Sequence, residues 1–142
     1  MADEWILDST LAADAVTVGD LPLSRVLIMQ DSQYPWVILV PRVPGVREIY
    51  ELEPMQQQQL LQESTFTAMW LMKHFKGDKL NIGALGNVVP QLHLHHIVRF
   101  ETDAAWPQPV WGVHPAKPYA EKTLAEFSRA LKEGLRLQAP LS

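Results

Sequence analysis

The chain has 142 residues, of which 47% are hydrophobic, 20% are charged and none is cysteine, so we expect one globular domain over residues 1–142, without disulfides or thiolate metal sites. The net charge of −4 gives no electrostatic reason to expect a nucleic-acid polymer as partner. No apolar run approaches the roughly 18 residues of a membrane span, and the acidic start Met1–Glu4 does not resemble a signal peptide; we therefore expect a cytoplasmic protein with no membrane partner.

Apolar periodicity and turn residues predict an antiparallel sheet with one long helix packed on it and a C-terminal helix, which is an α+β fold. The hairpin between the second and third strands is expected at Asp31–Pro35, which has the composition of a loop. In chain order we first expect a short helix at 5–14 and strands at 16–18, 23–29 and 36–40. A long helix at 54–75 and strands at 79–85 and 91–99 follow. The chain then ends with an irregular arm at 101–118 and a helix at 119–134.

Three of the five histidines lie within four residues, inside the stretch Gln91–Arg99 (QLHLHHIVR). Polar and apolar residues alternate up to His95, and this alternation is the period of a strand. On a strand, Gln91, His93 and His95 share one face, with neighbours roughly 6.5–7 Å apart. His96 falls on the other face, where we expect it to pack.

This row of side chains suits phosphate chemistry. A neutral imidazole is a good nucleophile near pH 7, and its attack on phosphorus splits one displacement into two steps. The phosphate oxygens also need N–H donors, because charge stabilisation supplies most of the rate in such reactions. We therefore predict His93 as the nucleophile, Gln91 and His95 as donors to the phosphate, and Asn87 with the amides of the Gly86–Pro90 turn as further donors.

The same stretch resembles the histidine-triad (HIT) motif, His-φ-His-φ-His-φ-φ, in which φ is an apolar residue. Other stretches resemble HIT proteins in the same order along the chain, and the resemblance covers roughly residues 20–112, with the C-terminal arm and helix at 101–137. They are the strand end Val37–Arg42, which is similar to the family's LVIPK, the long helix from Pro54, Asn81-x-Gly83, Gly86-Asn87 and Trp106-Pro107.

HIT proteins are dimeric nucleotide-binding hydrolases or nucleotidyltransferases. They cleave dinucleoside polyphosphates or nucleoside phosphoramidates through a nucleotidyl-histidine. The resemblance therefore implies a homodimer that binds a purine nucleotide and acts at its α-phosphate without a cofactor. It places the nucleophile at His93 and the third triad position at His95, and it matches Asp31 with an acidic residue that contacts the ribose.

The chain departs from the family at the first triad position, where Gln91 replaces histidine, and at Trp36, where a histidine often precedes the LVIPK strand. A carboxamide can donate or accept a hydrogen bond but cannot shuttle a proton near pH 7. We therefore expect an altered leaving-group preference or a reduced activity.

Several alternatives stay open at this point. Arg99 can anchor a phosphate or form a salt bridge, and Asp31 can cap the hairpin turn. Trp106 and Trp111 can close over a base or over a partner subunit's site, or they can simply pack. The protein can also be a catalytically weak nucleotide-binding protein. A His-x-His metal site of the cupin kind, with Glu101 as a further ligand, is the remaining alternative.

Overall fold

The computed structural model of the protein describes residues 4–141; residues 1–3, part of the acidic start of the chain, lie outside this range. Among the described residues, every helix is too short or too polar to cross a lipid bilayer. The elements are, in chain order, α1 (Ser9–Asp14), β1 (Ala15–Asp20), β2 (Ser24–Met29), β3 (Trp36–Pro41), the 3-10 helix η1 (Ile49–Glu51), α2 (Pro54–Phe75), β4 (Lys79–Gly83), β5 (Leu94–Arg99) and α3 (Glu121–Leu135).

The strands form one antiparallel sheet in the order β1-β2-β3-β5-β4, which leaves β1 and β4 at its edges. The predicted α+β class is confirmed, because the sheet carries the long helix α2 and the C-terminal helix α3 on it. The predicted strand at 79–85 ends earlier, at Gly83. The predicted arm at 101–118 contains no helix or strand.

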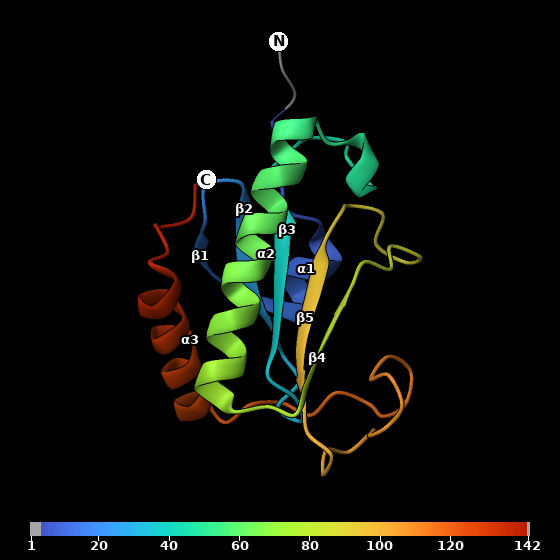
Figure 1. Ribbon diagram of the computed structural model, residues 1–142, viewed down its shortest axis with the longest axis vertical. Coiled ribbons are helices and arrows are strands. Elements are labelled where there is room, and N and C mark those ends of the chain that lie inside the picture. The colour runs from blue at the N-terminus through green and yellow to red at the C-terminus, as the bar shows by residue number, and fades with distance from the viewer. Residues whose placement is uncertain (1–3, 142) are drawn as a thin grey trace.

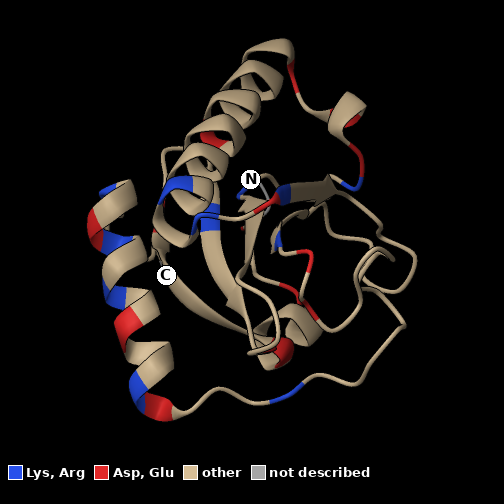
Figure 2. Ribbon diagram, turned by 60° about the horizontal axis from the view of Figure 1, so that its bottom comes forward, with Lys and Arg blue, Asp and Glu red and all other residues tan. Residues whose placement is uncertain are grey.

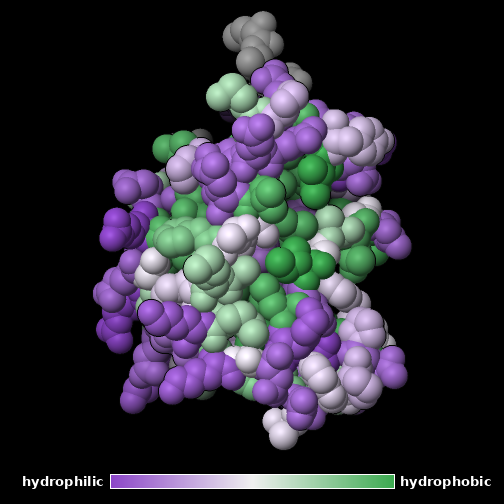
Figure 3. Space-filling view, viewed as in Figure 1, coloured by the Kyte–Doolittle hydropathy of each residue, from purple (hydrophilic) through white to green (hydrophobic). Residues whose placement is uncertain are grey.

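The helices lie on both faces of the sheet (Figure 1). α2 lies in front of the sheet with α3 beside it, and α1 lies behind, on the face that we call the rear face. Charged residues follow the outer side of α3, whereas α2 carries almost none (Figure 2). Apolar residues gather on the surface of this front face, over the middle of the molecule (Figure 3). α2 therefore carries fewer charged side chains than α3, and its exposed surface includes the apolar Leu61, Phe66 and Met69.

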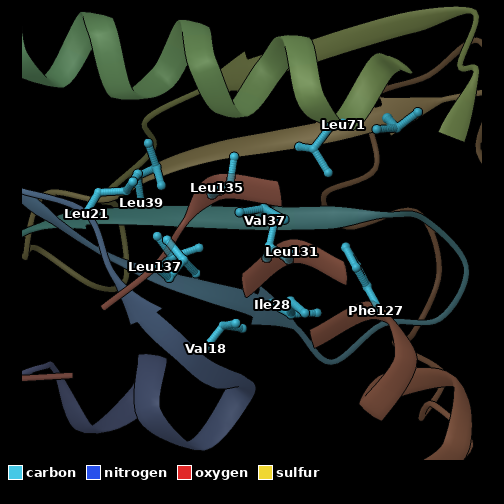
Figure 4. Close-up of a cluster of buried hydrophobic side chains, with 12 residues drawn as sticks. Val18, Leu21, Ile28, Val37, Leu39, Leu71, Phe127, Leu131, Leu135 and Leu137 are labelled. Atoms are coloured by element: carbon cyan, nitrogen blue, oxygen red, sulfur yellow. The ribbon is translucent and has the colours of Figure 1, made fainter. Parts of the chain in front are cut away.

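The larger core cluster fills the space between the sheet and the two long helices (Figure 4). Leu71 of α2 and Leu131 of α3 are fully buried there, against Val37 of β3. Burying such a side chain contributes about 1.5–3 kcal/mol, so this cluster fixes the front layer. Close packing continues at Gly134, where an added Cβ would lie 2.0 Å from the Trp70 ring.

α2 begins and ends where its sequence predicts. Glu53 and Gln56 form a capping box around Pro54, which fits the first turn because its missing N–H has no partner to lose there. Lys76 ends the helix in the left-handed conformation. Gly77 follows because an added Cβ would lie 2.3 Å from Val98 of β5, so the turn into β4 is too tight for a side chain.

Two predictions near the N-terminus were wrong. The helix expected at 5–14 begins only at Ser9, because the Asp8 side chain accepts hydrogen bonds from the first helical amides and residues 4–8 stay outside the helix. The strand expected to stop before Gly19 continues to Asp20 through a bulge. Gly19 is needed there because a Cβ would meet Leu137 and Gln138, which pass within 3 Å of it.

Candidate active site

The predicted alternation of the histidines is confirmed, although β5 itself begins at Leu94 and leaves Gln91 and His93 just before it. The rings of His93 and His95 lie on the rear face, with their centroids 4.9 Å apart. His96 points to the front face, where its Nε2 is 2.7 Å from Ser64 Oγ of α2. His96 is fully buried and therefore packs, as expected.

One hydrogen bond fixes the proton on His93. Its Nδ1 lies 2.7 Å from the backbone carbonyl oxygen of Gln91. Since a carbonyl oxygen only accepts, Nδ1 carries the hydrogen and donates it. In the neutral ring Nε2 then holds a free lone pair, which is what a nucleophile at phosphorus requires.

A second hydrogen bond fixes the opposite tautomer on His95. The indole Nε1–H of Trp36 donates to His95 Nδ1 over 2.9 Å, and an indole can only donate. The hydrogen of the neutral His95 ring is therefore on Nε2, so this ring offers an N–H donor. Burial lowers the pKa of His95 to about 3, with the neighbouring His93 and His96 adding to the effect. His95 is consequently uncharged near pH 7.

The side chain of Gln91 is bound to the N-terminal segment. Its Nε2 donates to the carbonyl oxygen of Ile6 over 2.9 Å, and its Oε1 accepts from the amide of Asp8 over 2.9 Å. We call residues 4–8 the N-terminal strap. The strap lies on the rear face, because Trp5 and Leu7 pack on the same cluster as α1. The carboxamide nitrogen, which was predicted to donate to a phosphate, is thus bound by this strap, and so is the carboxamide oxygen.

A cavity of about 490 Å³ lies on the rear face between the end of α1 and the arm. Trp36 and Trp111 line it, and both rings pack edge-on against His95, with centroids at 5.6 and 5.3 Å. His93 and His95 are themselves only 6% and 4% exposed. The cavity is thus separated from the histidines by the two tryptophans. Its full lining is Ala13, Asp14, Met29, Gln30, Asp31, Trp36, Val110, Trp111, Gly112, His114 and Ala116.

Asp31 lies in this cavity and also shapes the hairpin loop. Its Oδ1 accepts from the amide and the side chain of Gln33 and, over 3.4 Å, from the amide of Lys117 in the arm. Within residues 4–141 no protein group donates to its Oδ2. Both roles weighed for Asp31 are therefore compatible, because the turn uses one oxygen and leaves the other.

Arg99 is positioned as a structural residue. Its guanidinium donates to both carboxylate oxygens of Asp103, to Asn81 Oδ1 and to the carbonyl of Gln108, and the residue is 2% exposed. The ring of Trp106 lies 5.6 Å from the guanidinium carbon. The predicted phosphate-binding role of Arg99 does not fit these contacts, because nearly all its donors are engaged in holding the arm.

Asn87 is exposed in the loop between β4 and β5 and stays a predicted donor. Trp106 is half-buried beside Arg99 and does not line the cavity. The sequence indicated Trp111, like Trp106, as a ring that can close over a base or pack, but it gave no local signal for the contact of Trp111 with His95. It did mark Trp36, as a departure from the family pattern, but not as a hydrogen-bond donor to His95.

The metal-site alternative required a barrel and a cluster of ligands. The sheet is open, with free edges at β1 and β4, so the cupin-like fold is wrong. Within residues 4–141, no three His, Asp or Glu side chains are grouped so that they could hold a metal ion.

Stability is expected to fall as the pH is lowered from 7 toward 4. Burial lowers the pKa of His95 to about 3 and that of His96 to about 4, whereas an unfolded histidine has a pKa of about 6.5. Between these values the unfolded chain binds protons that the folded chain does not, so stability rises with pH and is fully present above about pH 7. Each histidine contributes up to about 1.4 kcal/mol per pH unit inside its window.

Urea unfolding at pH 5, 6 and 7 measures this slope. The His96→Gln variant lacks one of the two histidines that bind a proton only on unfolding. Its free energy of unfolding should therefore depend less steeply on pH, whatever its absolute stability. If the free energy of unfolding of the variant depended on pH as steeply as that of the wild type, the lowered pKa of His96 would not contribute to the pH dependence, and the prediction would be wrong.

The comparisons with known proteins agree with this geometry. A comparison with curated proteins finds no match, but the family model described as HIT domain matches residues 10–102. Among solved structures, the chain is similar to histidine triad proteins from Marinobacter aquaeolei VT8 (52% identity, TM-score 0.92, covering 94% of this chain and 98% of that one) and from Bradyrhizobium japonicum (47%, 0.92, 94% and 99%). It is also similar to one from Sinorhizobium meliloti 1021 (41%, 0.89, 92% and 96%). With the sheet, the helices and the histidine row all in place, the chain belongs to the HIT domain family.

Proposed function

We propose that the protein is a nucleotidyl hydrolase or transferase that acts at the α-phosphate of a purine nucleotide derivative. The observation that carries the proposal is the pair of opposite tautomers. His93 presents a free lone pair on Nε2, and His95, 4.9 Å away between ring centroids, presents an N–H on Nε2. A nucleophile beside a donor for the phosphate oxygens is the arrangement that a displacement at phosphorus needs.

In the first step His93 Nε2 forms a bond to phosphorus, and the bond from phosphorus to the leaving group breaks with its electron pair on the leaving group. The positive charge of the substituted ring is stabilised by the hydrogen bond from Nδ1 to the Gln91 carbonyl. In the second step water attacks phosphorus and loses a proton to solvent. The bond from phosphorus to Nε2 breaks with its electron pair on Nε2, which restores the neutral His93 ring. His95 donates to a phosphate oxygen in both steps.

The two neighbours of His93 in the triad supply no proton to the leaving group. Gln91 does not ionise near pH 7, and the low pKa of His95 keeps its ring uncharged. The site therefore favours a leaving group that departs as a stable anion. Dinucleoside polyphosphates, which release a nucleotide, fit this requirement better than phosphoramidates, whose amine must gain a proton.

The cavity between α1 and the arm is the proposed nucleoside site. Asp31 Oδ2 is free to accept from a ribose hydroxyl, and the partly exposed ring of Trp111 offers a stacking surface for a purine. Because Trp111 packs on His95 and both histidines are almost fully covered, we expect the substrate to displace Trp111 as it binds.

Replacing His93 with alanine should abolish turnover of diadenosine polyphosphates, because no other group in the site offers a free lone pair to phosphorus. We expect kcat to fall at least about 10³-fold while nucleotide binding, measured by calorimetry, is retained. A panel of adenosine and guanosine polyphosphates and phosphoramidates, assayed with both proteins, tests the assignment and the leaving-group preference together. Nucleotide binding without turnover by the wild type would instead indicate a binding protein.

The Trp36→Phe variant should lower kcat by about tenfold, because it keeps an aromatic ring but removes the hydrogen bond that fixes His95, which is worth about 1–1.5 kcal/mol. The hydrogen of His95 can then lie on Nδ1 instead of Nε2. In that fraction of the molecules, Nε2 no longer donates to the phosphate. Tyr34→Phe is the matched control, since Tyr34 packs edge-on against Trp36 but its hydroxyl has no partner among the described residues. Equal effects of the two variants on kcat would contradict the role of Trp36.

We further propose a homodimer formed through the apolar surface where α2 meets β4. β4 is an edge strand, and next to it Ile49, Leu61 and Ile82 are 41%, 68% and 49% exposed around an apolar groove. We call these three residues the α2–β4 face; it lies in the apolar part of the surface in Figure 3. An exposed edge strand beside apolar side chains can pair with a second copy of itself about a two-fold axis.

Leu61→Arg should convert the dimer to a monomer, because it would bury a charged side chain of each copy in an apolar interface. Light scattering after gel filtration should give a mass near 16.1 kDa for the variant and twice that for the wild type. Leu141→Arg, at a residue 63% exposed beside Asp20 on the far end of the chain, is the control and should stay dimeric. A monomeric wild type would contradict the proposal.

A further inference from the structure

The first triad position makes contacts that a histidine is poorly suited to make. The carbonyl of Ile6 and the amide of Asp8 flank a single residue of the N-terminal strap, and the Gln91 carboxamide binds both over 2.9 Å. A carboxamide carries its donor and its acceptor on one carbon, pointing the same way, whereas the two nitrogens of an imidazole point away from each other. One glutamine thus satisfies two backbone groups that no strand reaches.

The strap held in this way covers part of the rear face. Trp5 packs on the rear cluster and lies under Arg25 of β2, whose guanidinium carbon is 5.0 Å from the ring centroid. Leu7 packs on the same cluster, which contains Val40 of β3 and Val89 of the loop before the histidines. The strap therefore crosses the sheet from β2 to the start of the histidine row.

The strap also leads directly into the wall of the nucleoside cavity. Asp8, whose amide is bound by Gln91, caps α1 by accepting from the amide of Thr10 over 2.8 Å. The other end of α1 contributes Ala13 and Asp14 to the cavity lining. α1 has only six residues, so it cannot hold its own position without contacts at both ends.

We propose that Gln91 is a positioning residue, which fixes the strap and α1 as one wall of the nucleoside cavity and does not act on the phosphate. This inference rests on the proposed function for its kinetic consequences. The contacts of Gln91 then affect how tightly the nucleoside is bound, while the chemical step depends on His93 and His95. It also gives a structural reason for the replacement of the first triad histidine. The glutamine lacks a titratable ring, but its carboxamide binds two backbone groups of the strap.

The test begins with Gln91→Ala in the full chain, without nucleotide. Amide hydrogen exchange of residues 5–14, followed by mass spectrometry, should become about tenfold faster, because two hydrogen bonds that hold the strap are lost. Unchanged exchange in this segment would overturn the proposal. This measurement does not depend on turnover, so it stands even if the proposed function fails.

Kinetics with diadenosine tetraphosphate provide the second measurement. We expect Gln91→Ala to raise KM about threefold to tenfold and to leave kcat within about threefold. A loss of kcat comparable to that of His93→Ala, with KM unchanged, would show that Gln91 acts on the reacting phosphate and would overturn the proposal. If the wild type turns over no nucleotide, the same comparison is made with the Kd for AMP.

Asp8→Pro tests the clamp from the other side while Gln91 stays intact. Asp8 has a φ of −54°, which proline adopts without strain, so the substitution removes the amide that donates to Gln91 together with the carboxylate that caps α1. Asp8→Ala is the matched control, since it also loses the helix cap but keeps that amide. Asp8→Pro should raise KM further than Asp8→Ala does; equal values would contradict a clamp acting through this bond.

Discussion

The hydrogen bond from Trp36 Nε1 to His95 Nδ1 is the contact on which the chemistry of the site depends. It is 2.9 Å long and buried, and it decides which nitrogen of His95 carries the hydrogen. Together with the bond from His93 Nδ1 to the Gln91 carbonyl, it gives two adjacent imidazoles opposite tautomers. Neither ring needs to be charged to do its work. The burial of the site therefore suits both rings, because burial favours the neutral form.

The sheet supplies the geometry for this contact. In the antiparallel pairing of β3 with β5, Ile38 lies opposite His95, and Trp36 lies opposite Ile97. Trp36 and His95 are thus diagonal neighbours on the rear face, within reach of a long aromatic side chain. A shift of one residue in the register would turn His95 to the front face. The front core, which fixes that register through Val37 and Leu71, is in this way part of the site.

The protein buries several polar side chains, and some of them join separate segments of the chain by hydrogen bonds. His96 meets Ser64, and the Glu63 carboxylate accepts from the amides of Leu23 and Ser24 at the start of β2. The Arg99 guanidinium and the Asp103 carboxylate hold the beginning of the arm. Burial raises the pKa of Asp103, but the Arg99 hydrogen bond and charge outweigh it and hold that pKa below its usual range. The pair of Arg99 and Asp103 thus holds the start of the arm, whose Trp111 packs against His95.

Local patterns in the sequence determined the elements and the order of the histidine row. Alternation predicted which side chains of 91–99 share a face, and the helix at 54–75 followed from its apolar spacing and Pro54, because both signals depend on neighbours a few residues apart. The partners of the site residues could not be read in this way. Trp36 lies 59 positions from His95, and Ile6 lies 85 positions from Gln91. Only the folded chain decided that Gln91 binds the N-terminal strap and that Trp36 binds His95, because hydrogen bonds between distant segments form only once the sheet and its two layers have brought those segments together.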